Sequence, residues 1–203
     1  MQVGQTSNIQ NNHFMPTVMT VNVDDMDASF VEELKREYAH AAVEIKVQDR
    51  PYCAPSFTVD DFWKAIALLD WLQEGDDDRV VEPVVAYLVV QPLSHLYRFF
   101  DILAEKLWQL DTRAHAQVFL EDPDEEGYLS ADDFLYARCA VVANGRAFYE
   151  KVLGNPAQMP KDLTFEPLLY IVPAAYQRKT GKPFAAPSAF CFETYSNKKG
   201  WAK

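Results

Sequence analysis

The sequence predicts an α+β fold that is predominantly α-helical, with a helical domain preceded by a small strand–helix–strand unit. Apolar residues recur at helical spacing through most of the chain from Val59 onward. Two short runs nearer the N-terminus alternate apolar with polar residues, as half-buried strands do. The length of 203 residues and the apolar content of 49% suit one compact domain with a small appendage.

The N-terminal region is expected to have two parts. Residues 1–16 are rich in Gln and Asn and lack periodicity, so we expect a disordered leader there. Residues 17–49 are the expected strand–helix–strand unit, with strands over residues 19–23 and 43–47 and a helix over residues 27–38. Because two strands alone are marginally stable in water, this unit should dock on the C-terminal tail or on a second copy of the chain.

The helical domain is expected over residues 58–182. Thr58 is the predicted cap of a helix over residues 59–72, whose acidic first turn suits the helix dipole. After Pro92, a stripe of Leu and Phe predicts a long amphipathic helix that ends near Leu110. Such a stripe is typical of a hydrophobic core and not of a cofactor site.

Two more helices complete the expected domain. Ser130 is the predicted cap of a helix over residues 131–153, and Gly145 on its apolar face should have a packing reason, because a mid-helix glycine costs about 1 kcal/mol. The last helix is expected over residues 165–179, with a kink at Pro173, because proline removes a backbone hydrogen bond.

The tail, residues 183–203, shows the period of a strand. Its apolar and β-favouring side chains recur at every second position, at Phe190, Phe192 and Thr194. This alternation predicts an extra strand that could complete the N-terminal sheet.

Several stretches of the domain resemble a known family. They are residues 61–63, 130–138, 145–156 and 176–181, in this order and spacing. Together they resemble the bacterial domain-of-unknown-function family 4240 over about residues 58–182. The resemblance implies a small helical domain without an established activity. It also implies that Ser130, Asp132, Asp133 and Arg138 match the family's recurrent serine, acid pair and arginine.

The charge balance restricts the classes of partner. The net charge is −11 and no basic stripe is present, so double-stranded nucleic acid and anionic membrane would both be repelled. No apolar run approaches the roughly 20 residues that span a bilayer. The three cysteines are odd in number and widely spaced, which disfavours disulfides and favours the cytoplasm. A basic protein partner or a cation fits the sign of the charge better, and the alternative is that the charge only maintains solubility.

One acidic loop fits part of a calcium-binding template. That template places oxygen ligands at positions one, three, five, seven and twelve, and glycine at six. The matching residues are Asp122, Asp124, Glu126, Gly127, Tyr128 and Asp133. Glu126 is one methylene longer and Asp133 one methylene shorter than the usual ligands, which weakens the metal prediction.

A second candidate site includes two arginines on an apolar helix face. Arg138 and Arg146 have apolar neighbours at helical spacing, and a buried arginine needs a carboxylate partner. Asp111 is one candidate for a structural salt bridge with Arg138. The alternative is a polar pocket that binds a ligand, with Asp132, Asp133, Arg138 and Arg146 as its binding residues.

The sequence offers no catalytic set and implies no cofactor. The four histidines lack metal-binding spacing, and the seven glycines include no phosphate-binding loop. We therefore expect a non-enzymatic protein-binding module, of a toxin-neutralising, defence or regulatory kind. We also expect that its N-terminal unit contributes to partner binding or to homo-oligomerisation by strand addition. The alternatives are an enzyme or small-ligand binder around Asp132, Asp133 and Arg138, and a calcium-binding loop over residues 122–133.

Overall fold

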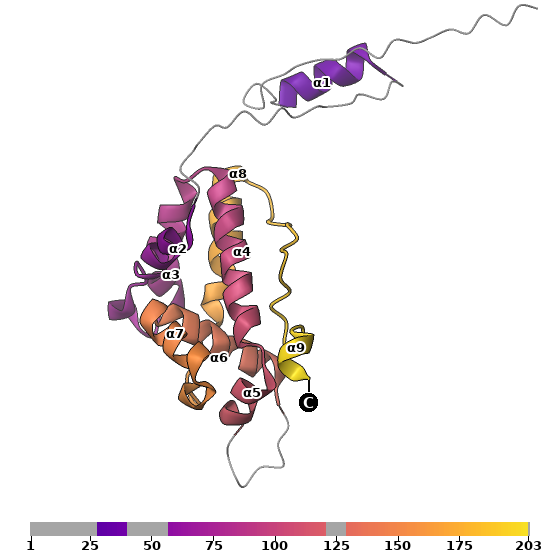
Figure 1. The fold of residues 1–203 in the computed structure, drawn as a ribbon. Helices are drawn as coiled ribbons and strands as arrows, with labels where there is room; N and C mark the ends of the chain where they lie inside the picture. The colour runs from indigo at the N-terminus through magenta and orange to yellow at the C-terminus, as the bar shows by residue number, and fades with distance from the viewer. Residues whose placement is uncertain (1–27, 40–56, 121–128, 203) are drawn as a thin grey trace, which may run out of the picture. The chain divides into compact units, whose positions relative to one another are not determined.

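The computed structural model describes residues 28–39, 57–120 and 129–202 (Figure 1). The chain divides into two units, Met1–Ala54 and Pro55–Lys203. In the first unit the described element is helix α1 (Ala28–Glu37), which confirms the predicted helix. Its exposed Lys35 and Arg36 pair with Glu32 and Glu33 one turn earlier.

The second unit is a bundle of helices joined by short connections (Figure 1). Its longest helix is α4, which lies between α3 and α6 in the sequence. The described elements are α2 (Val59–Ile66), η2 (Trp71–Gln73), α3 (Asp77–Val89), α4 (Leu93–Leu110), α5 (Arg113–Phe119), α6 (Ala131–Ala143), α7 (Arg146–Gly154), η3 (Pro156–Gln158), η4 (Glu166–Tyr170), α8 (Ile171–Thr180) and α9 (Lys198–Trp201), where η denotes a 3₁₀ helix.

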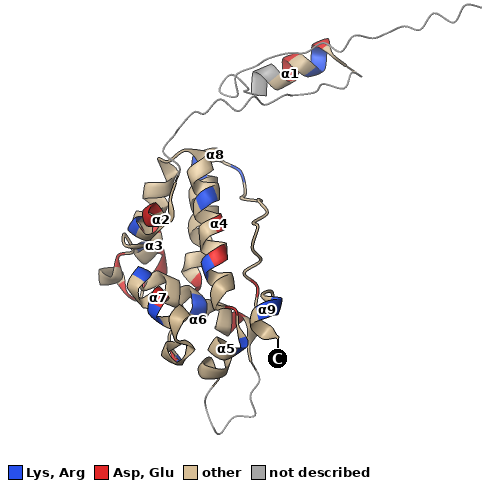
Figure 2. Cartoon of the chain, viewed as in Figure 1, with Lys and Arg blue, Asp and Glu red and all other residues tan. Residues whose placement is uncertain are grey.

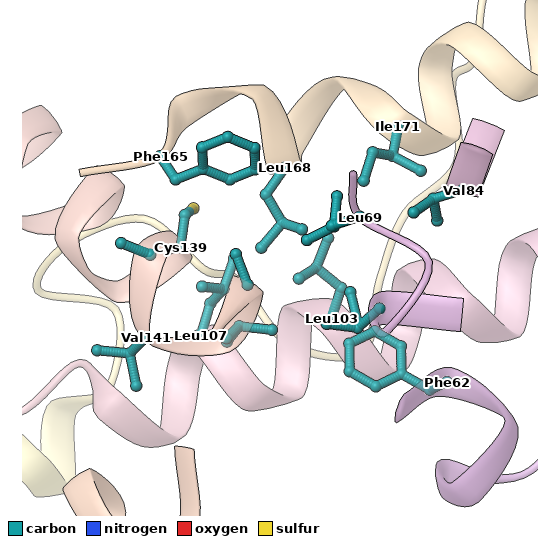
Figure 3. Packing of buried hydrophobic residues seen from close by; sticks show 14 of the residues in the cluster. Phe62, Leu69, Val84, Leu103, Leu107, Cys139, Val141, Phe165, Leu168 and Ile171 are labelled. Atoms are coloured by element: carbon teal, nitrogen blue, oxygen red, sulfur yellow. The ribbon is translucent and has the colours of Figure 1, made fainter. Parts of the chain in front are cut away.

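The core lies between α4 and α6 and the elements that cover them. Helix α3 packs mainly on α8, and η4 packs on α6, so sequence-distant elements share one interior. Figure 3 shows part of this interior, where Phe62, Leu103 and Leu168 come from different elements. Helix α6 is buried over most of its length, which makes it the central element of the core.

Two predicted helix starts are confirmed. Thr58 accepts a hydrogen bond from the Asp61 amide, and the Asp61 carboxylate accepts one from the Thr58 amide, which makes a capping box. Hydrogen bonds from the Thr58 hydroxyl and amide lower the pKa of Asp61 to about 2. Ser130 caps α6 by accepting a hydrogen bond from the Asp133 amide.

Gly145 ends one helix and begins another, so the predicted single helix over residues 131–153 is wrong. Helix α6 ends at Ala143, and Gly145 with φ 88° precedes α7. A Cβ atom at Gly145 would meet nothing within 4 Å. The glycine is therefore required by its left-handed backbone conformation and not by a close helix approach.

The region around Pro173 also differs from the prediction. The expected single helix over residues 165–179 consists of η4 followed by α8, and Pro173 is the third residue of α8. The first N–H groups of a helix have no acceptor within it, so proline costs little there. The chain therefore changes from a 3₁₀ helix to an α-helix at Ile171, and Pro173 lies in the first turn of α8.

The predicted α+β class is wrong, since the described ranges are mainly helical and contain no strand. The two strands expected over residues 19–23 and 43–47 lie outside the described residues, so only α1 of that unit is described. The extra strand expected in the tail is absent from residues 183–202. No helix in the described part of the chain is long and apolar enough to cross a membrane.

The alternation in the tail nevertheless has a structural basis. From residue 184 to residue 196, even-numbered residues are half-buried and odd-numbered ones are exposed. Phe190 packs on Trp108 of α4 with ring centroids 5.2 Å apart, and Phe192 packs on Phe100 at 6.1 Å. From residue 184 to residue 192 the tail is thus a segment without helix or strand that packs on helices through its side chains.

Candidate functional site

The connection between α2 and α3 is a turn held by hydrogen bonds. The Asp70 amide donates to the Val80 carbonyl at 3.0 Å, and the Asp70 carboxylate accepts from the Leu72 amide at 3.1 Å. Gly75, with φ 97°, turns the chain, and Asp76 caps α3. These contacts fix the direction of the residues between them, although the segment lies at the surface.

Two large apolar residues of this turn point into solvent. Leu72 is 94% exposed and Trp71 is 44% exposed, whereas Leu69 belongs to the core. One face of the Trp71 ring packs against Phe165, with ring centroids 5.0 Å apart. Leu68 is also exposed, so three apolar side chains of one turn lie at the surface.

A cluster of tyrosines around one carboxylate continues from Phe165. The Tyr170 hydroxyl donates to Glu166, and the Phe165 amide donates to the Tyr136 carbonyl at 3.0 Å. Burial, and then the neighbouring Glu166 and Asp132 carboxylates, raise the pKa of Tyr136 to about 12. The Tyr136 phenol is therefore protonated at neutral pH and can donate a hydrogen bond, whereas the Tyr170 hydroxyl already donates its proton to Glu166.

Acidic residues border this surface. Glu74 and the run from Asp76 to Asp78 are exposed around the start of α3 and are red in Figure 2. On α4 and α7, by contrast, acidic and basic residues are interspersed (Figure 2). We name the surface formed by Leu68, Trp71, Leu72, Tyr136, Glu166 and Tyr170, with its acidic border, the aromatic–acidic face.

Arg138, a ligand-binding candidate in the sequence analysis, is buried in the structure. Its side chain is 0% exposed and donates to the Leu107 carbonyl and the Thr194 hydroxyl, both at 2.9 Å. Its guanidinium also lies over the Phe134 ring, 4.9 Å from the centroid. Burial lowers the pKa of Arg138 and the nearby Asp111 carboxylate opposes that shift, so the arginine remains charged at neutral pH.

Asp111, the expected partner of Arg138, is also buried, at 0% exposure. Its carboxylate accepts hydrogen bonds from the tail and not from the arginine. The donors are the Tyr195 amide, the Ser196 hydroxyl, the Asn197 amide and the Trp201 indole, at 2.8–3.2 Å. The two charges interact electrostatically within one buried network that fastens the tail to α4 and α6.

The other predicted pocket residues lie elsewhere. Asp132 and Asp133 are exposed in the first turn of α6, where they suit the helix dipole. Arg146 is half-exposed and bonds Glu150 at 2.7 Å and Asp60 at 2.8 Å, which ties α7 to α2. The structure therefore does not bring Asp132, Asp133, Arg138 and Arg146 together around one pocket.

Most of the predicted calcium ligands lie outside the described residues, namely Asp122, Asp124 and Glu126. Asp133 is described, and its backbone amide serves the Ser130 cap. Among residues 28–39, 57–120 and 129–202, no group of three His, Cys, Asp or Glu side chains could hold a metal ion. Burial raises the pKa of the Cys139 thiol to about 12, so this thiol is not an activated nucleophile.

The sequence patterns missed the aromatic–acidic face. They placed Leu68 and Leu72 in a helix over residues 59–72, whereas α2 ends at Ile66. Asp70 was the sequence signal that the helix ends before residue 72. A short acidic side chain can accept hydrogen bonds from the amides that follow it, and this competes with continuation of the helix.

The fold and these contacts define a small helical domain. Its buried charged side chains, Asp111 and Arg138, have structural partners, and several apolar side chains lie at one surface. A family model for proteins of unknown function, DUF4240, matches residues 57–178. The match spans more than half of the chain, so this protein belongs to the DUF4240 family. No curated protein and no solved structure shows significant similarity to the chain.

Proposed function

We propose that this chain is a non-enzymatic protein-binding module and that the aromatic–acidic face is its binding surface. The observation that carries the proposal is the exposure of Leu72 beside Trp71 on a turn fixed by hydrogen bonds. Exposed apolar side chains grouped at one place mark interaction sites, and tryptophan and tyrosine are enriched among the residues that dominate binding energy.

The chemistry of the face suits a partner with an apolar cleft and basic residues around it. Leu72 and Trp71 would enter the cleft, because they are the most protruding apolar residues of the turn. Lysines or arginines of the partner would then face Glu74 and the aspartates of the α3 start. Such opposite charges increase the association rate and make it depend on salt concentration.

The test compares two exposed apolar residues in the full-length chain. Leu72→Asp places a charge in the centre of the proposed interface, whereas Val90→Asp alters a residue that is also exposed, at 76%, after α3. Proteins captured from the native host by the wild-type chain should be lost with Leu72→Asp and retained with Val90→Asp. Equal capture by all three chains would refute the aromatic–acidic face as the binding surface.

We further propose that the module acts in the cytoplasm, in a regulatory, defence or toxin-neutralising complex. The free thiols of Cys139 and Cys191 suit a reducing compartment. Fractionation of the native host followed by immunodetection tests the location, and recovery outside the cytoplasm would contradict it.

A further inference from the structure

The tail packs along α4 in a groove lined by aromatic side chains. We name residues 183–202 the strap (Figure 1). Phe184 of the strap lies among Tyr97 and Phe100 of α4 and Tyr176 of α8, with ring centroids 5.9, 5.0 and 5.3 Å away. This slot is built by the helices, and the strap supplies only the ring that fills it.

The first half of the strap is attached by side chains alone. In the described part of the chain, the backbone of residues 183–192 makes no hydrogen bond to any helix. Every second residue is half-buried, with Phe184, Phe190 and Phe192 packed on aromatic rings of the helices, and the intervening residues are exposed. This is how an extended peptide binds a groove when alternate side chains provide recognition.

The second half is attached by the buried charges of the helical domain. All four hydrogen bonds that Asp111 accepts come from the strap. Arg138 donates to Thr194, whose hydroxyl donates in turn to the Ala131 carbonyl at 2.6 Å. Two of the donors to Asp111 are backbone amides, those of Tyr195, which lies in a turn with φ 72°, and of Asn197, which begins α9.

The groove and the strap also differ in their relation to the family. The residues that form the groove, Tyr97, Phe100, Asp111, Arg138 and Tyr176, lie inside the matched residues 57–178. The strap lies entirely beyond them. The groove is thus part of the family domain, and the segment that fills it in this chain is not.

We propose that this groove is a peptide-binding site and that the strap is its built-in occupant. When the strap leaves, the groove binds a peptide whose extended part carries aromatic residues at alternate positions and is followed by a turn that contains threonine or serine. Release of the strap starts in its first half, at Phe184, because residues 183–192 have no backbone hydrogen bonds to the helices that would have to break. The proposal is independent of the aromatic–acidic face.

The test opens the strap in the full-length chain and leaves the groove unchanged. The opened variant carries Phe184→Ala and Thr194→Val, which remove the ring in the slot and the bonds to Arg138 and Ala131. The probe is a fluorescent synthetic peptide with the wild-type sequence of residues 183–202, and binding is measured by fluorescence anisotropy. Glu193→Gln, at an exposed position of the strap, is the matched control.

The Kd of the opened variant for the probe should be at least about tenfold lower than that of the wild type. In the wild type, the chain's own strap competes with the probe at high effective concentration. The Glu193→Gln control should behave as the wild type, and a probe carrying the two opening substitutions should lose the gain. The added change Leu72→Asp should leave probe binding intact, which separates this result from that of the proposed function. A folded opened variant that does not bind, or one that loses its cooperative thermal transition, would show that the strap is an integral part of the fold and overturn the proposal.

Discussion

Two regions of this protein depart from the usual distribution of polar and apolar residues in opposite ways. The network around Asp111 and Arg138 buries two charged side chains, whereas the aromatic–acidic face exposes Leu72 and part of Trp71. In the buried network every charge has hydrogen-bond partners from the protein. At the exposed face Leu72 gains almost nothing from folding, since it remains in water, and Trp71 gains only from its partly buried ring.

The comparison separates stability from binding. With the strap in place, a fully bonded buried charge contributes to stability, because losing one partner leaves the others unsatisfied in a dry interior. An exposed leucine on a hydrogen-bonded turn is not required by the fold, and the proposed function assigns it to binding. Substitutions in the two regions should affect different measurements.

The largest effect is expected from Arg138→Ala. This change leaves the Leu107 carbonyl and the Thr194 hydroxyl without their donor and Asp111 without its neighbouring positive charge. We expect a loss of about 3 kcal/mol in the free energy of unfolding, measured by urea denaturation. Arg146→Ala is the matched control, and it should cost much less, because the ion pairs of Arg146 are solvent-exposed. Equal losses in the two variants would contradict the structural role of Arg138.

The next effect is on binding and not on stability. Trp71→Ala should weaken binding of the captured partner by about 2 kcal/mol, which is roughly thirtyfold in Kd. Because one face of the Trp71 ring also packs on Phe165, the Leu72→Ala variant separates binding from packing. Leu72→Ala should leave the urea midpoint unchanged, and calorimetry should still show weaker binding. A lower urea midpoint with unchanged affinity would assign this turn to the core.

A smaller effect is expected from the titration of His115. This side chain is buried, its Nε2 donates to the Val152 carbonyl at 3.1 Å, and its Nδ1 accepts from the Thr112 hydroxyl at 2.7 Å. Burial lowers the pKa of His115 below its ordinary value of 6.5. The unfolded chain therefore binds a proton first as the pH falls below about 6.5, so stability decreases with acidification.

The measurement for His115 is the urea midpoint between pH 7.5 and pH 5. His115→Gln lacks the titrating group, so its midpoint should fall less over this range than that of the wild type. Identical pH profiles would show that His115 does not contribute to the acid sensitivity.

The smallest effect is expected at an ion pair between α3 and α8. Arg178 donates two hydrogen bonds to the Glu82 carboxylate, at 2.6 and 2.9 Å, and both side chains are about half-exposed. Glu82→Gln should cost under about 1 kcal/mol, and the loss should shrink further at high salt. A loss as large as that of Arg138→Ala would contradict the comparison between buried and exposed charges.

Three things could be predicted from the sequence: the helical domain, the family and several local features. The caps at Thr58 and Ser130 and the helix that ends at Leu110 follow from side chains near one another in the chain. Local hydrogen bonds and helical periodicity are short-range properties, so they can be read from sequence. The alternation of side chains in the tail also predicted, correctly, that successive residues face the helices and the solvent in turn.

Tertiary structure alone decided what these elements contact. Alternation at Phe190 and Phe192 specifies an extended chain but not its neighbour, and the neighbour is helix α4 instead of a strand. Likewise, an arginine among apolar residues calls for polar partners without naming them, and the strap supplied Thr194 from 56 residues away. Leu72 is at the surface because the Asp70 amide bonds to Val80 of α3 and the chain turns there. These contacts join residues distant in sequence, and no short-range pattern encodes them.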